Sequence, residues 1–185
     1  MKNKTNVGNV IIVLDKPLGR DDVRILLGRK GPRKKSDDKR KRKRVGIGCW
    51  VPPGGGTESD DKSQKHSARR ELLEETGFLF PLKSFKKVGV MRVFLSDILI
   101  WVVHIYLVDT TDPNLDYAIG EDDGEYLDMR WFSLEKLPFA KMLEGDGDWL
   151  PRIMKGEKLS IIKRIKKSPN GSTKCSVEMK PVNFN

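Results

Sequence analysis

The sequence predicts a mixed α/β fold, in which a β-sheet packs between helices. Two observations carry this prediction. Apolar, β-branched runs of strand length stand on both sides of a central helical segment, and a second helical pattern begins near residue 133. The length of 185 residues fits one domain with short appendages, since a domain typically takes ~100–150 residues.

The predicted strands follow the apolar runs along the chain. VIIVL at 10–14 and VRILLG at 23–28 are separated by DKPLGRDD, whose Pro, Gly and paired Asp favour a turn, so the three form a hairpin. Two longer strands are predicted at Lys87–Phe94 and Asp97–Val108, and the second is apolar enough to lie centrally in a sheet. A short strand is predicted at Met129–Phe132.

The rest of the chain is predicted to be less regular. SLEKLPF at 133–139 begins a helix-like segment, and WVPPGGG at 50–56 is a loop. We expect a single domain over residues 1–165 and a peripheral tail over 166–185. A basic insertion lies at about 29–46, and its block Lys39–Arg44 is expected to be an exposed loop, because like charges repel and stay solvated.

Charge and composition restrict the partners and the compartment. Lys and Arg number 36 against 26 Asp and Glu, giving a net charge of +10. This balance favours a polyanionic partner, although it does not choose among nucleotide, nucleic acid, inositol phosphate and acidic lipid. Two distant cysteines indicate a reducing compartment. Neither a signal peptide nor an apolar run of ~20 residues is found, so we expect a cytoplasmic protein without membrane spans.

Three glutamates share one face of the predicted central helix, Ser63–Thr76. Ser63 caps its start and Gly77 stands where a C-terminal cap belongs. The spacing of Glu71, Glu74 and Glu75 projects all three from one side, where like charges repel. A solvated acidic face paired with neighbouring arginines is the simpler interpretation.

A metal site is the alternative for these glutamates. The glycine run Gly54–Gly56 stands before the helix and can bring a backbone carbonyl close to them. Three carboxylates and a carbonyl provide the hard oxygen ligands that Mg²⁺ or Mn²⁺ prefers. Divalent metal neutralises phosphoryl oxygens and activates water, which is what phosphate chemistry needs.

The pattern resembles the box of the Nudix hydrolases, G-x5-E-x7-R-E-U-x-E-E-x-G-U, where U is a bulky apolar residue. Gly56 takes the first position and Arg70–Phe78 matches the whole second half at the right spacing. The resemblance implies an αβα sandwich with a mixed β-sheet between helices. It also implies metal-dependent hydrolysis of a nucleoside diphosphate linked to another moiety.

The resemblance further implies a set of site residues. Its catalytic and metal ligands fall on Glu71, Glu74, Glu75 and the Gly56 carbonyl, with a further ligand at Glu125, before the Trp-Phe strand. Asp122 and Asp123 are substitutes for Glu125, and a solvated turn is the simpler role for it. The first box glutamate is Lys62 here, which cannot accept a hydrogen bond from Arg70. Glu58, Asp60 and Asp61 are the candidates to replace it.

The flanks resemble MutT-type 8-oxo-dGTP diphosphatases. The purine-recognising acidic pair of that group falls on Gly145 and Asp146, so one carboxylate is absent, and a helix cap is the simpler role for Asp146. Asn9 takes a position that faces the base in relatives, and Arg70 completes the predicted substrate-binding set. His104 also matches a histidine of the group, although a strand histidine is more often structural.

The predicted function is therefore a metal-dependent pyrophosphohydrolase that cleaves nucleoside triphosphates, oxidised purines first, to monophosphate and pyrophosphate. Pro53-Gly54-Gly55-Gly56 also resembles the diphosphoinositol polyphosphate phosphohydrolases, so these or dinucleoside polyphosphates are the alternative substrates. A weakly active module that binds nucleic acid through Lys39–Arg44 is a second alternative. The sequence gives no oligomeric state.

Overall fold

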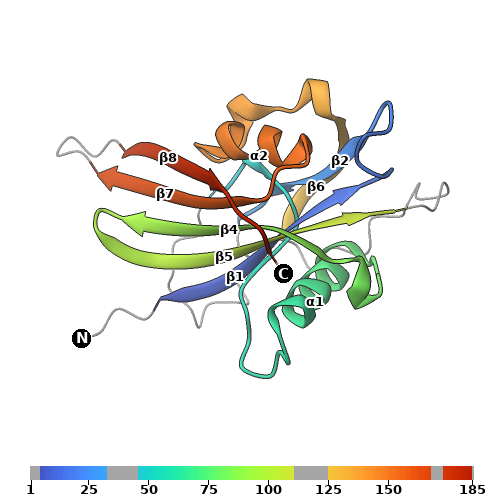
Figure 1. Ribbon diagram of the computed structural model, residues 1–185, viewed down its shortest axis with the longest axis horizontal. Coiled ribbons are helices and arrows are strands. Elements are labelled where there is room, and N and C mark those ends of the chain that lie inside the picture. Colours follow the sequence, from blue (N-terminus) through green and yellow to red (C-terminus); the bar gives the residue numbers. More distant parts are fainter. Residues whose placement is uncertain (1–4, 33–45, 111–124, 168–172, 185) are drawn as a thin grey trace.

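The computed structural model describes residues 5–32, 46–110, 125–167 and 173–184. Within these ranges one mixed sheet of eight strands runs in the order β3-β2-β1-β5-β4-β7-β8, and β6 pairs with β2. Helix α1 lies against one face of the sheet and α2 against the other (Figure 1). The predicted mixed α/β fold is confirmed. None of the described helices is long and apolar enough to cross a bilayer.

The helices and strands have the following bounds. The strands are β1 Asn6–Leu14, β2 Arg24–Lys30, β3 Trp50–Val51, β4 Lys86–Leu95, β5 Ile98–Asp109, β6 Tyr126–Ser133, β7 Leu159–Lys167 and β8 Thr173–Pro181. The helices are α1 Gln64–Thr76 and α2 Asp146–Met154. Both helices lie in connections between strands, α1 between β3 and β4 and α2 between β6 and β7.

Strands β1 and β5 pair in parallel at the centre of the sheet. Because both faces of β1 are covered, its second half is a continuous apolar run, the pattern expected of buried parallel strands. Ile11 packs with Ala68 and Leu72 of α1, whereas Ile12 packs with Trp149 and Ile153 of α2. Alternate residues of one strand thus belong to two separate cores, one under each helix.

The first half of β1 is covered by a loop. β1 and β2 pair antiparallel at Leu14 and Ile25, which confirms the predicted hairpin, but β2 then diverges to pair with β3 and β6. The segment Pro53–Thr57 takes the vacated edge: the amides of Asn9 and Ile11 donate to the carbonyls of Gly55 and Pro53, both at 2.8 Å. This glycine-rich loop therefore bonds to β1 in the way that a neighbouring strand would.

Two predicted segments differ in the structure. Residues 133–139 form no α-helix but short 3-10 turns at Leu134–Lys136 and Phe139–Lys141, because Pro138 lacks an amide donor and disfavours the helical conformation of Leu137. The sheet also continues past residue 165, since β7 extends to Lys167 and β8 pairs antiparallel with it. The segment predicted as a peripheral tail is therefore an edge strand.

Candidate active site

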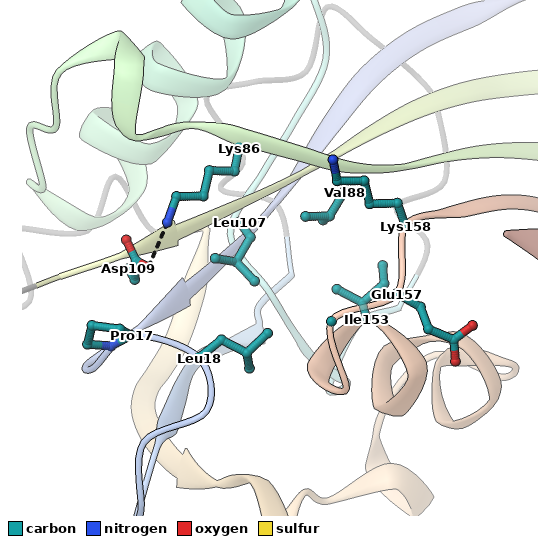
Figure 2. Close-up of a pocket in the computed structure, with 10 residues that line it drawn as sticks. Pro17, Leu18, Lys86, Val88, Leu107, Asp109, Ile153, Glu157 and Lys158 are labelled. Atoms are coloured by element: carbon teal, nitrogen blue, oxygen red, sulfur yellow. Dashed lines mark hydrogen bonds and ion pairs between the residues drawn. The ribbon is translucent and has the colours of Figure 1, made fainter. Parts of the chain in front are cut away.

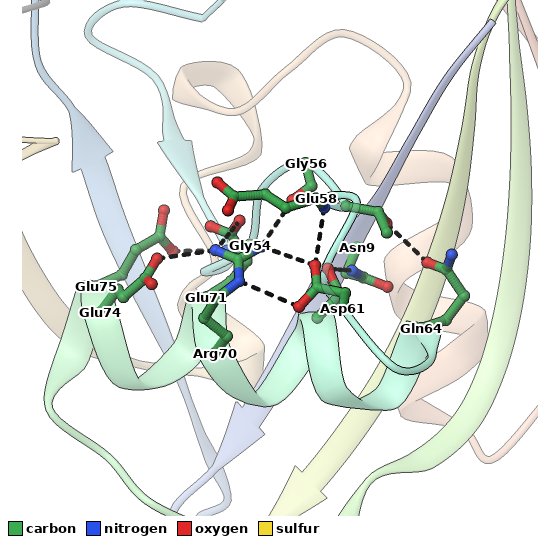
Figure 3. Close-up of polar contacts among 12 residues, drawn as sticks. Asn9, Gly54, Gly56, Glu58, Asp61, Gln64, Arg70, Glu71, Glu74 and Glu75 are labelled. Carbon is green, nitrogen blue, oxygen red and sulfur yellow. Dashed lines mark hydrogen bonds and ion pairs between the residues drawn. The ribbon is translucent and has the colours of Figure 1, made fainter.

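Helix α1 begins and ends where the sequence predicts. Ser63 has extended backbone dihedral angles, and its hydroxyl accepts a hydrogen bond from the amide of His66 at 3.3 Å. Gly77 ends the helix in the left-handed conformation, and its amide donates to the carbonyl of Leu73. Ala68 and Leu72 pack into the core, and this packing sets the rotation of the helix so that Glu71 and Glu75 face the glycine loop (Figure 3).

The glycine loop lies between β1 and helix α1, and its alternate backbone groups form hydrogen bonds with β1 and with side chains of the helix (Figure 3). The carbonyls of Pro53 and Gly55 accept from β1, whereas the amide of Gly54 donates to Glu75 Oε2 at 2.7 Å. A Cβ on Gly55 would lie 2.2 Å from Glu71 Oε2, so a side chain there would displace that carboxylate. Glycine permits this close approach of backbone to the helix.

Arg70 is the centre of the charged network on this helix face. Its Nε and Nη2 donate to the two oxygens of Asp61 at 3.2 and 3.0 Å, and Nη2 also donates to the Gly56 carbonyl at 3.0 Å. Its Nη1 lies 2.9 Å from Glu71 Oε1 and 2.9 Å from Glu74 Oε2. The box arginine therefore connects the predicted carbonyl ligand to two of the three predicted carboxylate ligands.

Asp61 occupies the role that the box glutamate leaves open. Its side chain is only 6% exposed and accepts hydrogen bonds from Arg70 with both oxygens, whereas Lys62 is exposed. The Arg70 guanidinium lowers the pKa of Asp61 below its ordinary value. Of the three acids that the sequence offered, Glu58 and Asp60 are exposed, so Asp61 is the one that the fold selects.

Glu75 is a buried carboxylate that is only half satisfied. Its Oε2 accepts from the Gly54 amide at 2.7 Å and from the Tyr126 hydroxyl at 3.0 Å. Its Oε1 is buried, and no hydrogen-bond partner is found for it among the described residues. Burial, reinforced by the charge of Glu125, raises the pKa of Glu75 well above its ordinary value. A cation near Oε1 would relieve both penalties.

Glu71 and Glu125 add to this concentration of negative charge. Burial raises the pKa of Glu71 to about 7, against the opposing effect of Arg70. Glu125, at the start of β6, lies close enough to raise the pKa values of both Glu71 and Glu75, and its Oε1 is 3.4 Å from Lys30 Nζ. The structure thus brings Glu125 to the same end of α1 as the box glutamates.

The donor atoms fit a hard divalent cation in chemical type. The described residues contain no ready-made cluster of three acidic, histidine or cysteine side chains in a metal-binding arrangement. Arg70 contacts three of the predicted ligands, since its guanidinium bonds to Glu71, Glu74 and the Gly56 carbonyl. The unpartnered Glu75 Oε1 is the observation that favours a cation here.

Asp146 lies on the opposite face of the sheet, at the start of α2. Its Oδ1 accepts from Trp149 Nε1 at 3.0 Å and lies 3.6 Å from Lys163 Nζ, which extends from β7. The side chains of Asp146 and Lys163 are 6% and 9% exposed. Burial raises the pKa of Asp146, while Lys163 opposes that shift. Asp146, the residue predicted to recognise a purine, is therefore a buried carboxylate paired with Lys163.

Position 145, where the resemblance places the other residue of the acidic pair, has little room for a side chain. Gly145 precedes α2 with φ 87°, a left-handed conformation that disfavours other residues. A Cβ at this position would lie 2.6 Å from Val177 Cγ2 and 3.3 Å from Cys175 Sγ. Strand β8 thus presses against the start of α2 and excludes a side chain at 145.

Asn9 does not share a pocket with Asp146. Its Nδ2 donates to Ser67 Oγ of α1 at 2.9 Å, and its Oδ1 is buried without a partner among the described residues. His104, paired with Asn9 across β1 and β5, occupies the same face, and burial lowers its pKa. Both residues therefore lie on the α1 face. The role of Asn9 toward a base stays a prediction.

A concavity of about 330 Å³ lies away from the box (Figure 2). Leu18, Val88, Leu107 and Ile153 supply its apolar wall, with the Lys86–Asp109 ion pair, at 2.9 Å, beside them. None of the predicted site residues lines it, so it is distinct from the candidate active site.

Sequence reasoning missed two residues of the site and could not reach others. Tyr126 gave no signal, since nothing local indicates that its hydroxyl reaches Glu75. Lys163 gave a detectable one, because it follows Leu159 and Ile161 on the buried face of a strand. The predicted basic block Lys39–Arg44 and the substitutes Asp122 and Asp123 lie outside the described residues.

The capped helix, the glycine loop and the neighbouring acids lie together at one end of the sheet, as the box resemblance predicted. Comparison with known families agrees, since the NUDIX domain model matches residues 6–153. The chain belongs to the Nudix family, as the box resemblance predicted.

Individual relatives are more distant. An oxidized purine nucleoside triphosphate hydrolase of Danio rerio is 28% identical over 115 residues, covering 62% of this chain and 68% of the relative. A MutT protein of Bacillus halodurans has a TM-score of 0.59 at 18% identity, with 96% and 99% of the two chains covered. A bifunctional NMN adenylyltransferase/ADP-ribose pyrophosphatase of Francisella tularensis, in complex with AMP and a manganese ion, has a TM-score of 0.57 at 18% identity; the match covers 83% of this chain and 42% of that protein. At these identities the solved structures support the fold alone.

Proposed function

We propose that this Nudix hydrolase cleaves nucleoside triphosphates to a monophosphate and pyrophosphate, that oxidised purine triphosphates are its first substrates, and that it uses Mg²⁺ or Mn²⁺. The observation that carries the proposal is the half-satisfied Glu75 among Glu71 and Glu125, opposite a glycine loop. The similarity to a hydrolase of oxidized purine nucleoside triphosphates supports the substrate class.

The residues of the α1 face would hold the metal. Glu71, Glu74, Glu75, Glu125 and the Gly56 carbonyl supply the oxygens, and a bound divalent cation would neutralise phosphoryl charge and activate water. Arg70 keeps the Gly56 carbonyl and the carboxylates in register through its five donors. Gly54 and Tyr126 orient Glu75 by donating to one oxygen, which leaves the other free to act.

The α2 face would read the base. Asp146 is held by Trp149 and Lys163, so its orientation is fixed before a substrate arrives. A buried carboxylate beside an ammonium presents an acceptor and a donor together, which is the pattern needed to match a purine edge. Because mismatched buried polar groups are costly, such a pair can discriminate an altered donor–acceptor pattern.

A substrate screen tests the proposal. Purified protein with MgCl₂ or MnCl₂ would be offered 8-oxo-dGTP, dGTP, ADP-ribose, a dinucleoside polyphosphate and a diphosphoinositol polyphosphate. We expect 8-oxo-dGTP to have the highest kcat/KM and to release pyrophosphate, measured as phosphate after added pyrophosphatase. Absence of hydrolysis of 8-oxo-dGTP would refute the substrate assignment, and hydrolysis of the inositol compound would favour the alternative.

A variant of Glu75 tests the metal site. Glu75→Gln keeps the size of the side chain and removes the charge, so we expect kcat/KM to fall by ~100-fold or more, since a metal contact stabilises the transition state by several kcal/mol. Thermal unfolding provides an independent measurement, because MnCl₂ should raise the Tm of the wild type but not of the variant. Glu58→Gln, an exposed glutamate in the loop before α1, is the matched control.

A further inference from the structure

The loop before α1 is closed on itself. The amide of Glu58 donates to Asp61 Oδ2 at 2.8 Å, and the amide of Asp61 lies 3.4 Å from the Glu58 carbonyl. The Thr57 hydroxyl donates to Gln64 Oε1 at 2.9 Å, which fastens the loop to the first turn of the helix. Asp61 therefore has a fixed direction, and that direction is toward Arg70.

The Arg70 guanidinium contacts four different residues in a single orientation. Its Nη2 must reach the Gly56 carbonyl while its Nη1 reaches Glu71 and Glu74 on the following turn. The contact with both oxygens of Asp61 fixes the plane of the guanidinium, because a two-pronged Arg–carboxylate pair constrains geometry as well as distance. Without Asp61 only the contacts with Gly56, Glu71 and Glu74 would restrain that plane.

We infer that Asp61 is a positioning residue of the metal site, which holds Arg70 so that Arg70 sets the Gly56 carbonyl and the Glu71 carboxylate. It does so from nine residues before Arg70, although the box places its carboxylate at position 62, eight residues before. The carboxylate has thus moved by one residue, and the closed turn makes the new position reach the same arginine. This inference rests on the proposed metal-dependent function.

The neighbours of Asp61 provide matched controls. Asp60 has the same chemistry and is exposed on the same loop, and Lys62 is exposed at the position where the box has its glutamate. A carboxylate restored at 62 should reach Arg70 when Asp61 is absent, because eight residues is the spacing of the box. The double variant thus moves the carboxylate to the box position, and it also removes the positive charge of Lys62.

The test measures Mn²⁺ binding by electron paramagnetic resonance in wild type, Asp61→Ala, Asp60→Ala and the double variant Asp61→Ala/Lys62→Glu. We expect Asp61→Ala to raise the Mn²⁺ dissociation constant by ~10–100-fold, the usual effect of losing a group that orients metal ligands. The double variant should recover most of the affinity, and Asp60→Ala should match wild type. Asp61→Asn serves in place of Asp61→Ala if the alanine variant does not fold.

Two results would overturn the inference: wild-type Mn²⁺ affinity in the folded Asp61 variant, or failure of the folded double variant to recover. The measurement of Mn²⁺ binding needs no substrate. A wild type that binds Mn²⁺ but hydrolyses no diphosphate would therefore refute the proposed substrates and leave the role of Asp61 to be decided by binding alone.

Discussion

The two faces of the sheet carry buried carboxylates in opposite states. On the α1 face, Glu75 has one oxygen without a hydrogen-bond partner among the described residues, and the nearby acids raise its pKa further. On the α2 face, Asp146 is equally buried, but Trp149 donates to it and Lys163 lies 3.6 Å away. The same chemical group is thus left incomplete on one face and completed on the other.

The difference indicates what each face lacks. An uncompensated buried carboxylate is costly, so under the proposed function a cation bound on the α1 face would offset this cost. The α2 face already contains its own cation, so a ligand there would be recognised by hydrogen bonding rather than by charge neutralisation. Under the proposed function, the α1 face would act on the phosphates and the α2 face would recognise the base.

Removing the internal cation should make the α2 face resemble the α1 face. Lys163→Met leaves Asp146 buried and unpaired, so we expect a loss of ~3 kcal/mol in the free energy of unfolding at pH 8, the low end for a broken buried pair because Asp146 can take up a proton. Urea denaturation measures this loss. Lys166→Met, an exposed lysine of the same strand, should change little. Equal stabilities of the two variants would contradict the pairing.

Restoring a side chain beside Asp146 should damage the α2 face rather than complete it. Gly145→Ala combines a left-handed backbone with contact to Val177, so we expect a loss of ~2–4 kcal/mol in the free energy of unfolding. Gly156 also has a left-handed backbone, φ 89°, but has open space around its Cβ position. Gly156→Ala should therefore lose only ~1 kcal/mol, the backbone part alone. A similar loss in both variants would show that β8 does not crowd position 145.

The smallest expected effect concerns the pH dependence of metal stabilisation on the α1 face. The folded pKa of Glu71 is raised to about 7, above its unfolded value, so the folded protein keeps a proton that the unfolded chain releases as pH rises. Metal-free stability should therefore fall as pH increases from about 4.5 to 7. Because a metal must displace that proton, the rise in Tm on adding MgCl₂ should be larger at pH 8 than at pH 6. An equal rise at both values, measured by calorimetry, would contradict this prediction.

Local rules predicted the parts of the site that depend on neighbours in sequence. Ser63 and Gly77 are recognisable caps that mark the ends of α1, and the spacing of the glutamates relative to Ala68 and Leu72 gives the side that they occupy. Choosing Asp61 over its neighbours required the closed turn at Glu58, which no pattern encodes.

Long-range packing accounts for what the sequence did not predict. Strand β7 was missed because Lys163 interrupts its buried apolar positions, and the interruption is explained only by Asp146 on a helix. The absence of a side chain at Gly145 likewise depends on β8, a strand thirty or so residues later in the chain. Such contacts have no signature in local periodicity.

The hydrogen bonds between β1 and Pro53–Thr57 determine which backbone groups of the glycine loop point toward helix α1. Residues 53, 55 and 57 bond to β1, so residues 54 and 56 present their amide and carbonyl to the helix. Inserting or deleting one residue before Gly54 would exchange the residues that bond to β1 with those that face the helix. The carbonyl that now accepts from Arg70 would then bond to β1 instead. The length of this loop is therefore constrained by the alternation of its hydrogen bonds with β1, independently of the substrate.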